Sequence, residues 1–391
     1  MITKEKIVTA ILLLGLAPVL YANSQAEKPN TASIIYSPFQ IHIDPMESLL
    51  LINFENDPDS LYLGFEPQLF NDSINGEGML VIAWRTDGFV DVYHQPGLEP
   101  DRNKYDIAGK GLAHMIEVPL EGAFFRVEEA GVQAWFRFTD IAGRVIDSRI
   151  HESSKRKRKP FGLLAPMGHA AENPSAMPLI LLHDFYFVRR ANTEVSIRIN
   201  SRSHEPDLLP MSMDRQKMYF TRYSTDPLIA TINPACNTHL EAIAISGQEA
   251  VSQNNHYDLV SRNGRQFISR ITAKHAHHNL HMNFYPPFPN LSSVVDGDSL
   301  NGDFEIQGHP SAGKVKGKYS IVRRDSLIQV TVKPSGGWKP RPDKFSLRFL
   351  YTVAGIFKNW PKTYVWKADI LMTENGQPEI QAAWTRDLKN Q

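Results

Sequence analysis

A cluster of histidines in segment 274–281 is the first place where residue types and spacing suggest chemistry. If this segment is a strand, His275, His277 and His281 project from one face, because side chains alternate between the two faces of a strand. Imidazoles side by side could bind Zn, Fe or Cu. No carboxylate follows at a spacing typical of a metal site, so a polar strand face lining a cavity is the alternative. Metal analysis of the purified protein would distinguish the two.

Segment 181–190 combines a histidine with aromatic side chains. On a strand, His183 and Phe185 would share one face, and Asp184 and Tyr186 would share the other. A histidine beside aromatic residues could act as a general acid or base, and Tyr186 could line a small-molecule pocket. The alternative is a histidine packed in the core with its hydrogen bonds satisfied.

Segment 84–94 places an acid, a phenol and an imidazole near one another. Asp91 and Tyr93 would share a strand face and, with His94 next to them, could transfer protons or support hydration chemistry. Trp84, at the start of the segment, is a candidate for ligand contact. Polar residues near the end of a hairpin, without a catalytic role, are the alternative.

Arg222 lies among aromatic residues in segment 219–224. Its guanidinium could bind a carboxylate or stack on a ring, and the adjacent Tyr223 would extend such a binding surface. The alternative is a structural ion pair between Arg222 and either Asp214 or Asp226.

Several common enzyme classes have no signature in this chain. There is no Gly-x-Ser-x-Gly nucleophile motif, no phosphate-binding loop, no dinucleotide fingerprint and no His-Glu-x-x-His motif. Cys236 is the only cysteine, so it cannot form an internal disulfide, and we expect it to be a small buried hydrophobe. We therefore expect no cofactor.

The elements that would position these residues are strands, because apolar and polar residues alternate with a period of two. The alternation is clearest in segments 132–138, 194–199, 328–332 and 364–370. Turns with glycine in second place separate the strands and predict consecutive hairpins. They are Asp87-Gly88, Ala130-Gly131, Ala142-Gly143, Asn263-Gly264 and Asn375-Gly376. We predict an all-β fold of two antiparallel barrels or sandwiches, since closing a meander hides its edge strands.

Helices should be few and short. The best candidate is 343–360, where large apolar residues recur at helical spacing after a potential N-cap at Asp343, and Pro361 follows its end. A strand pair through 346–356 is the alternative.

Three stretches lack strand periodicity and are interpreted as linkers or long loops: 153–178, 201–214 and 283–303. The first carries the basic run 155–159, which we interpret as a solvated loop, with a patch for phosphate or lipid headgroups as the alternative. The third contains Tyr285, a further candidate for ligand binding.

Residues 1–26 have the charged start, apolar run and small residues of a signal peptide, so we expect a periplasmic or secreted protein. An uncleaved anchor is the alternative, and no later segment is apolar enough to span a bilayer. We place an N-terminal β domain at 27–230 and a C-terminal one at 231–391. The 42 basic and 42 acidic residues balance, which gives no long-range field for nucleic acid.

In length and strand pattern, the chain resembles the tandem lipocalin-like proteins that include carotenoid hydratases (hydroxyneurosporene synthases). The resemblance lies in a meander at 78–152, a long connection and a second β-rich half. That half contains Gly-Lys-Val-Lys-Gly-Lys-Tyr at 313–319 and closes with Trp-Thr-Arg at 384–386. The resemblance implies a pair of barrels with an apolar pocket for a lipid-like or isoprenoid ligand, in some members with acid-catalysed addition of water.

The leading hypothesis is therefore an exported β-barrel protein that binds a hydrophobic small molecule and could hydrate or isomerise it. A second is a metal-dependent enzyme that uses His275, His277 and His281. A third is a non-catalytic envelope or interaction protein, which would engage an envelope partner through its sheet faces and the basic run 155–159.

Overall fold

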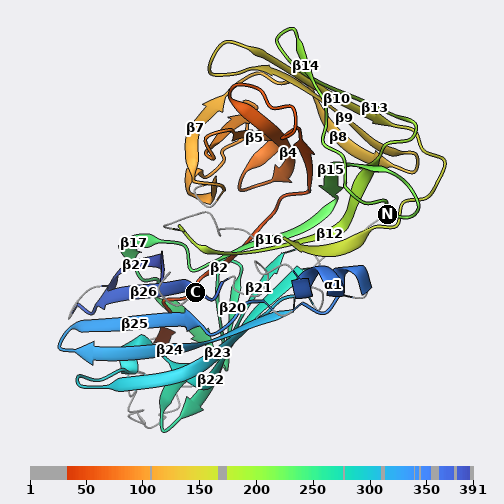
Figure 1. Cartoon of the computed structure of the whole chain (residues 1–391). Coiled ribbons are helices and arrows are strands. Elements are labelled where there is room, and N and C mark those ends of the chain that lie inside the picture. Colours follow the sequence, from red (N-terminus) through yellow and green to blue (C-terminus); the bar gives the residue numbers. More distant parts are fainter. Residues whose placement is uncertain are drawn as a thin grey trace, which may run out of the picture. The chain divides into compact units, whose positions relative to one another are not determined.

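The computed structural model describes nine stretches of the chain: residues 33–105, 108–165, 174–275, 278–309, 313–338, 340–342, 345–353, 361–373 and 377–387. Most of these residues lie in strands, and the predicted all-β class is confirmed (Figure 1). The predicted signal peptide, His277 and the Asn375-Gly376 turn lie outside the described residues. No helix within them is long and apolar enough to cross a membrane.

The C-terminal half of the chain forms most of a twelve-stranded antiparallel sheet, drawn from teal to blue in Figure 1. Its order is β1 (Ile34–Ile35), β18 (Ile243–Ser246), β19 (Glu249–Ser252), β20 (Asn255–Arg262), β21 (Arg265–His275), β22 (His278–Pro289), β23 (Ser299–Gln307), β24 (Lys314–Arg324), β25 (Leu327–Pro334), β26 (Tyr364–Leu371), β27 (Glu379–Arg386) and β17 (Cys236–His239). From β18 to β27 each strand pairs with its sequence neighbour, as predicted for a meander. The predicted helix appears as α1 (Phe345–Val353), which excludes a strand pair over those residues.

A ten-stranded sheet is built mainly from the N-terminal half. Its order is β2 (Ile41–Asp44), β16 (Asp226–Ile232), β12 (Met177–Arg189), β15 (Met218–Ser224), β3 (Ser48–Asn53), β4 (Tyr62–Asp72), β5 (Gly76–Arg85), β6 (Val90–His94) and β7 (Leu112–Glu117), and β11 (Phe161–Ala165) also pairs with β12. The β5–β6 hairpin around Asp87-Gly88 is confirmed. The expectation of antiparallel pairing throughout is wrong at β6 and β7, which pair in parallel. The connection between them, which includes the 3-10 helix η1 (Arg102–Tyr105), is long enough to bring the chain back to the same edge.

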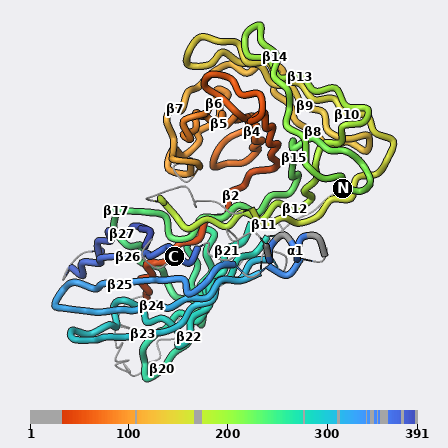
Figure 2. The backbone as a smooth tube through the Cα atoms, in the orientation of Figure 1, coloured from red at the N-terminus to blue at the C-terminus, as the bar shows by residue number. Residues whose placement is uncertain are grey.

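A five-stranded sheet packs against one face of β4–β6 and makes a sandwich with it. Its order is β14 (Arg202–His204), β13 (Thr193–Ile199), β10 (Val145–Glu152), β9 (Gly131–Thr139) and β8 (Glu121–Glu128). Rings meet across the interface: Phe65 lies 5.9 Å from Phe136, and Tyr93 lies 4.5 Å from Phe138, measured between ring centroids. Figure 2 shows β8, β9 and β10 beside β4 and β5.

β12 is largely buried on both faces, and the neighbouring β16 is buried on one face and partly buried on the other. Met177, Leu179 and Leu181 of β12 belong to the apolar cluster of the twelve-stranded sheet, whereas Ile180 and Leu182 belong to the cluster of the N-terminal sheets. Successive side chains of a strand point to opposite faces, so β12 contributes to both cores. The predicted domain boundary at residue 230 falls inside β16.

Candidate functional site

A cavity of about 890 Å³ is lined largely by side chains of the ten-stranded sheet. Its walls are mostly apolar, because alternate residues of β3, β5 and β12 turn their aliphatic side chains to this face. Representative wall residues are Leu49, Leu51, Ile82, Ile180, Leu182 and Phe185. At one end the lining includes the exposed residues Glu99 and Asp101 and Ile74, which is 60% exposed, so the cavity is open there.

Polar groups on the cavity face come from the neighbouring strands β4 and β5 and from β15, which β3 separates from β4. Glu66 on β4 is buried and accepts hydrogen bonds from Gln68 Nε2 at 2.9 Å and from the indole Nε1 of Trp84 at 3.3 Å. Arg222 on β15 pairs with Leu51 on β3. The pairs Leu49–Gln68 and Ile52–Phe65 between β3 and β4 place Leu51 opposite Glu66. The cavity face therefore carries an acid, an indole N–H, an amide and a guanidinium.

Burial is the main influence on the Glu66 carboxyl and raises its pKa above the ordinary value, against the lowering effects of Gln68, Arg222 and Trp84. A buried carboxylic acid of this kind keeps its proton at a higher pH than an exposed one. Gln68 Oε1 is buried without a hydrogen-bond partner among the described residues. A protonated Glu66 would supply that partner if the Gln68 amide turned over, since its O–H can donate to the amide oxygen.

Arg222 is half-buried and its guanidinium has few partners. Its Nη1 donates to Asn53 Oδ1 at 2.6 Å and to the Phe220 carbonyl at 3.0 Å, and its guanidinium lies 4.4 Å from the Phe220 ring centroid. Among the residues that the structure describes, no carboxylate lies within ion-pair distance of Arg222. The predicted alternative of a structural pair with Asp214 or Asp226 is therefore wrong: Asp214 accepts from Tyr186, and Asp226 bonds to a histidine.

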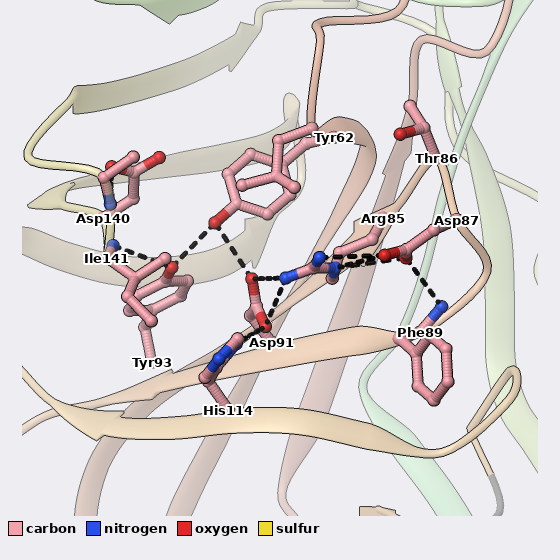
Figure 3. A network of polar contacts seen from close by, with 12 residues as sticks. Tyr62, Arg85, Thr86, Asp87, Phe89, Asp91, Tyr93, His114, Asp140 and Ile141 are labelled. Atoms are coloured by element: carbon pink, nitrogen blue, oxygen red, sulfur yellow. Dashed lines mark hydrogen bonds and ion pairs between the residues drawn. The ribbon is translucent and has the colours of Figure 1, made fainter.

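The opposite face of β4–β6 carries a second polar group, centred on Asp91 (Figure 3). The Asp91 side chain is 0% exposed and its carboxylate accepts from three donors: the Tyr62 hydroxyl at 3.2 Å, Arg85 Nη1 at 3.2 Å and His114 Nδ1 at 2.8 Å. The Tyr62 and Tyr93 hydroxyls are 2.7 Å apart. Since the Tyr62 proton points to Asp91, Tyr93 donates to Tyr62.

This Asp91 network brings two predicted catalytic residues together, but with partners that the sequence did not indicate. His94 bonds to the Gln95 carbonyl instead, and the imidazole beside Asp91 is that of His114, whose side chain is 44% exposed. Tyr93 also accepts from the backbone N of Ile141, in the turn between β9 and β10 of the facing sheet. None of the network residues lines the cavity. The bond between Ile141 and Tyr93 connects the network to the other sheet of the sandwich.

His183, the third predicted catalytic residue, lies in a separate group. Its ring stacks on His278 with centroids 5.1 Å apart and meets His309 edge-on at 4.6 Å. His278 Nε2 is 2.9 Å from Asp226 Oδ1, and Asp226 pairs with His183 in the β12–β16 register. The stacked rings direct their faces, not their nitrogens, at each other.

The expected single strand through 274–281 is wrong, because the chain reverses between His275 and His278, which pair across the β21–β22 hairpin. His281 pairs instead with Thr272 and its Nδ1 lies 3.0 Å from the Thr272 hydroxyl. Within the described part of the chain, no group of three His, Cys, Asp or Glu residues is arranged to hold a metal ion. Burial lowers the pKa of His281.

The predicted ligand-binding residues separate into two sets. Trp84 and Arg222 line the cavity. Tyr186 and Tyr223 are buried in the apolar cluster of the N-terminal sheets, and Tyr285 is 58% exposed on the twelve-stranded sheet. Glu66 was not among the residues predicted from the sequence to form the site. A signal was present, because Glu66 and Gln68 are polar residues two positions apart inside the apolar run of β4.

Comparisons with family models, with curated proteins and with solved structures found no match for this chain.

Proposed function

We propose that this protein binds a hydrophobic, lipid-like small molecule in the cavity of the ten-stranded sheet. The observation that carries the proposal is the cavity itself, about 890 Å³ with mainly apolar walls and a few polar groups on one side. Small-molecule sites in proteins combine these properties, typically at roughly 300–1,000 Å³. The cavity favours this function over the metal-dependent and envelope-interaction alternatives. The sequence of residues 1–26 is the basis for proposing an exported location.

Binding is tested with a neutral apolar fluorescent probe. Leu51→Trp adds bulk to the cavity wall and should weaken probe binding by at least tenfold. Leu371→Trp adds the same bulk at a position 42% exposed on β26, outside the cavity lining, and should leave binding unchanged. Circular dichroism would check that both variants fold. An empty wild-type cavity, or equal binding by both variants, would contradict the proposal.

Glu66 supports a chemical step on the bound ligand. Its carboxylic acid could donate a proton to a carbon–carbon double bond, forming a new C–H bond and leaving a cation. Water would then add to that cation and return a proton to the Glu66 carboxylate, which completes hydration. Loss of a neighbouring C–H proton to the carboxylate instead would give the isomerised alkene.

This step is tested by incubating the protein with acyclic isoprenoid alkenes in deuterated water and measuring deuterium uptake by mass spectrometry. Wild-type protein should label the alkene, and Glu66→Gln should bind it without labelling it. Labelling that persists in Glu66→Gln would exclude Glu66 as the proton donor.

A further inference from the structure

We propose that the ligand is an amphipathic monocarboxylate, such as a long-chain fatty acid, and that Arg222 binds its carboxylate inside the cavity. The proposal rests on the proposed function, because it assigns a chemical class to the molecule held at the same site.

The first observation is the incomplete bonding of Arg222. Only its Nη1 has hydrogen-bond acceptors among the described residues, namely Asn53 Oδ1 and the Phe220 carbonyl. Nε and Nη2 have none there. A guanidinium remains charged in proteins, so its positive charge lies at an apolar cavity without a carboxylate in contact. An apolar ligand that fills the cavity would take water away from this charge, which is costly unless a counter-ion joins it.

The second observation is that neither nearby acid balances this charge. Glu66 lies across Leu51, two strand spacings from Arg222, or about 10 Å between backbones. Burial raises the pKa of its carboxyl, although the charge of Arg222 acts in the opposite direction, so Glu66 keeps its proton to a higher pH than an exposed acid. Glu55 is engaged by Asn53 Nδ2 at 2.8 Å, and Asn53 stands between it and Arg222. The bound molecule is therefore expected to bring the missing negative charge.

The guanidinium geometry selects the head group. The free Nε and Nη2 form a planar fork that matches the two oxygens of a carboxylate. One carboxylate also neutralises one guanidinium, whereas a phosphate monoester would leave surplus negative charge in an apolar site. The Phe220 ring against the guanidinium holds the fork in position.

The remaining cavity fits an apolar chain. The lining includes Ile82 and Trp84 of β5 and, in the turn before this strand, Ile74 and Asn75. Trp84 lies about 26 Å from the start of β5 at Gly76 at the usual strand rise. The aliphatic lining residues come from β3, β5 and β12, and the exposed Ile74 lies at the open end. The apolar chain of a carboxylate bound at Arg222 would therefore lie against these side chains and extend toward the opening near Ile74.

The test compares palmitic acid with hexadecanol, which has the same chain length and no charge, by displacement of the neutral apolar probe at neutral pH. Wild-type protein should bind palmitic acid about 10- to 100-fold more tightly, the range expected for charge-assisted hydrogen bonds. Arg222→Met should lose this preference and still bind hexadecanol. Arg126→Met removes an exposed arginine on β8 and should keep it.

The outcomes separate the two proposals. Equal binding of acid and alcohol by wild-type protein overturns the carboxylate assignment and leaves the proposed function standing. Absence of binding by probe, acid and alcohol overturns the proposed function as well. A hexadecyl phosphate that binds more tightly than palmitic acid overturns the choice of head group. If Arg222→Met does not fold, the wild-type comparison of acid with alcohol decides.

Discussion

Replacing Glu66 by glutamine should change how the stability of the protein depends on pH. Burial raises the pKa of Glu66 in the folded protein above its ordinary value of 4.5, so the folded state holds this proton more tightly than the unfolded state. The stability from the protonated acid is fully present below about pH 4.5. It is lost as the pH rises toward the folded pKa, at up to about 1.4 kcal/mol per pH unit for one proton. The glutamine side chain of the variant cannot ionise, so the free energy of unfolding of Glu66→Gln should not fall with pH for this reason.

The assay is chemical denaturation of wild-type and Glu66→Gln protein at a series of pH values from 4 to 8. The difference in unfolding free energy should shift in favour of Glu66→Gln as the pH rises and then level off above the folded pKa. Glu249→Gln, at an exposed position on β19, is the control and should show no such trend. A constant difference across the series would refute the argument that Glu66 is destabilised as an anion.

Three further predictions concern stability and processing. Asp91→Ala should lower the free energy of unfolding by about 2–3 kcal/mol in denaturant titrations, since it leaves three donors without their acceptor. Gly122→Ala should cost several kcal/mol more than Gly143→Ala: both glycines have positive φ, but a Cβ on Gly122 would lie 2.1 Å from the Trp135 ring, whereas nothing lies within 4 Å at Gly143. Protein recovered from an exported fraction should have the intact mass of a chain cleaved within residues 22–26; an uncleaved mass would favour the anchor alternative.

The strands and tight turns could be predicted because they depend on local chemistry. Period-two alternation and glycine-containing turns located the β5–β6 and β20–β21 hairpins without long-range information. The meander expected at 78–152 is interrupted, because β6 and β7 pair in parallel and β7 and β8 belong to different sheets. The reversal between His275 and His278 was missed because no glycine, proline or asparagine lies between them in the sequence. Without that reversal, His275 and His281 were assigned to one face of one strand.

Pairing between distant segments could not be predicted in this way. His114 reaches Asp91 only because β7 returns to pair in parallel with β6, and no local pattern specifies that choice. Arg222 approaches Glu66 through β3, which belongs to a different part of the sequence. Residue types alone therefore identified Trp84 and Arg222 as candidates but did not show which acid they accompany.

The β5–β6 register explains why segment 84–94 does not form one site. Trp84 pairs with Val90, and Ala83 pairs with Asp91, so Trp84 and Asp91 project from opposite faces of the sheet. The carboxylate with three donors faces the sandwich, where its hydrogen bonds join β4, β5 and β7 of one sheet to β6. The acid with a raised pKa faces the cavity, where a neutral carboxyl group is compatible with an apolar ligand. Both acids lie on strands of one sheet, so residue type does not distinguish their roles. The face of the sheet to which each side chain points does: Asp91 has a structural role on one face, and Glu66 is proposed to act on the ligand on the other.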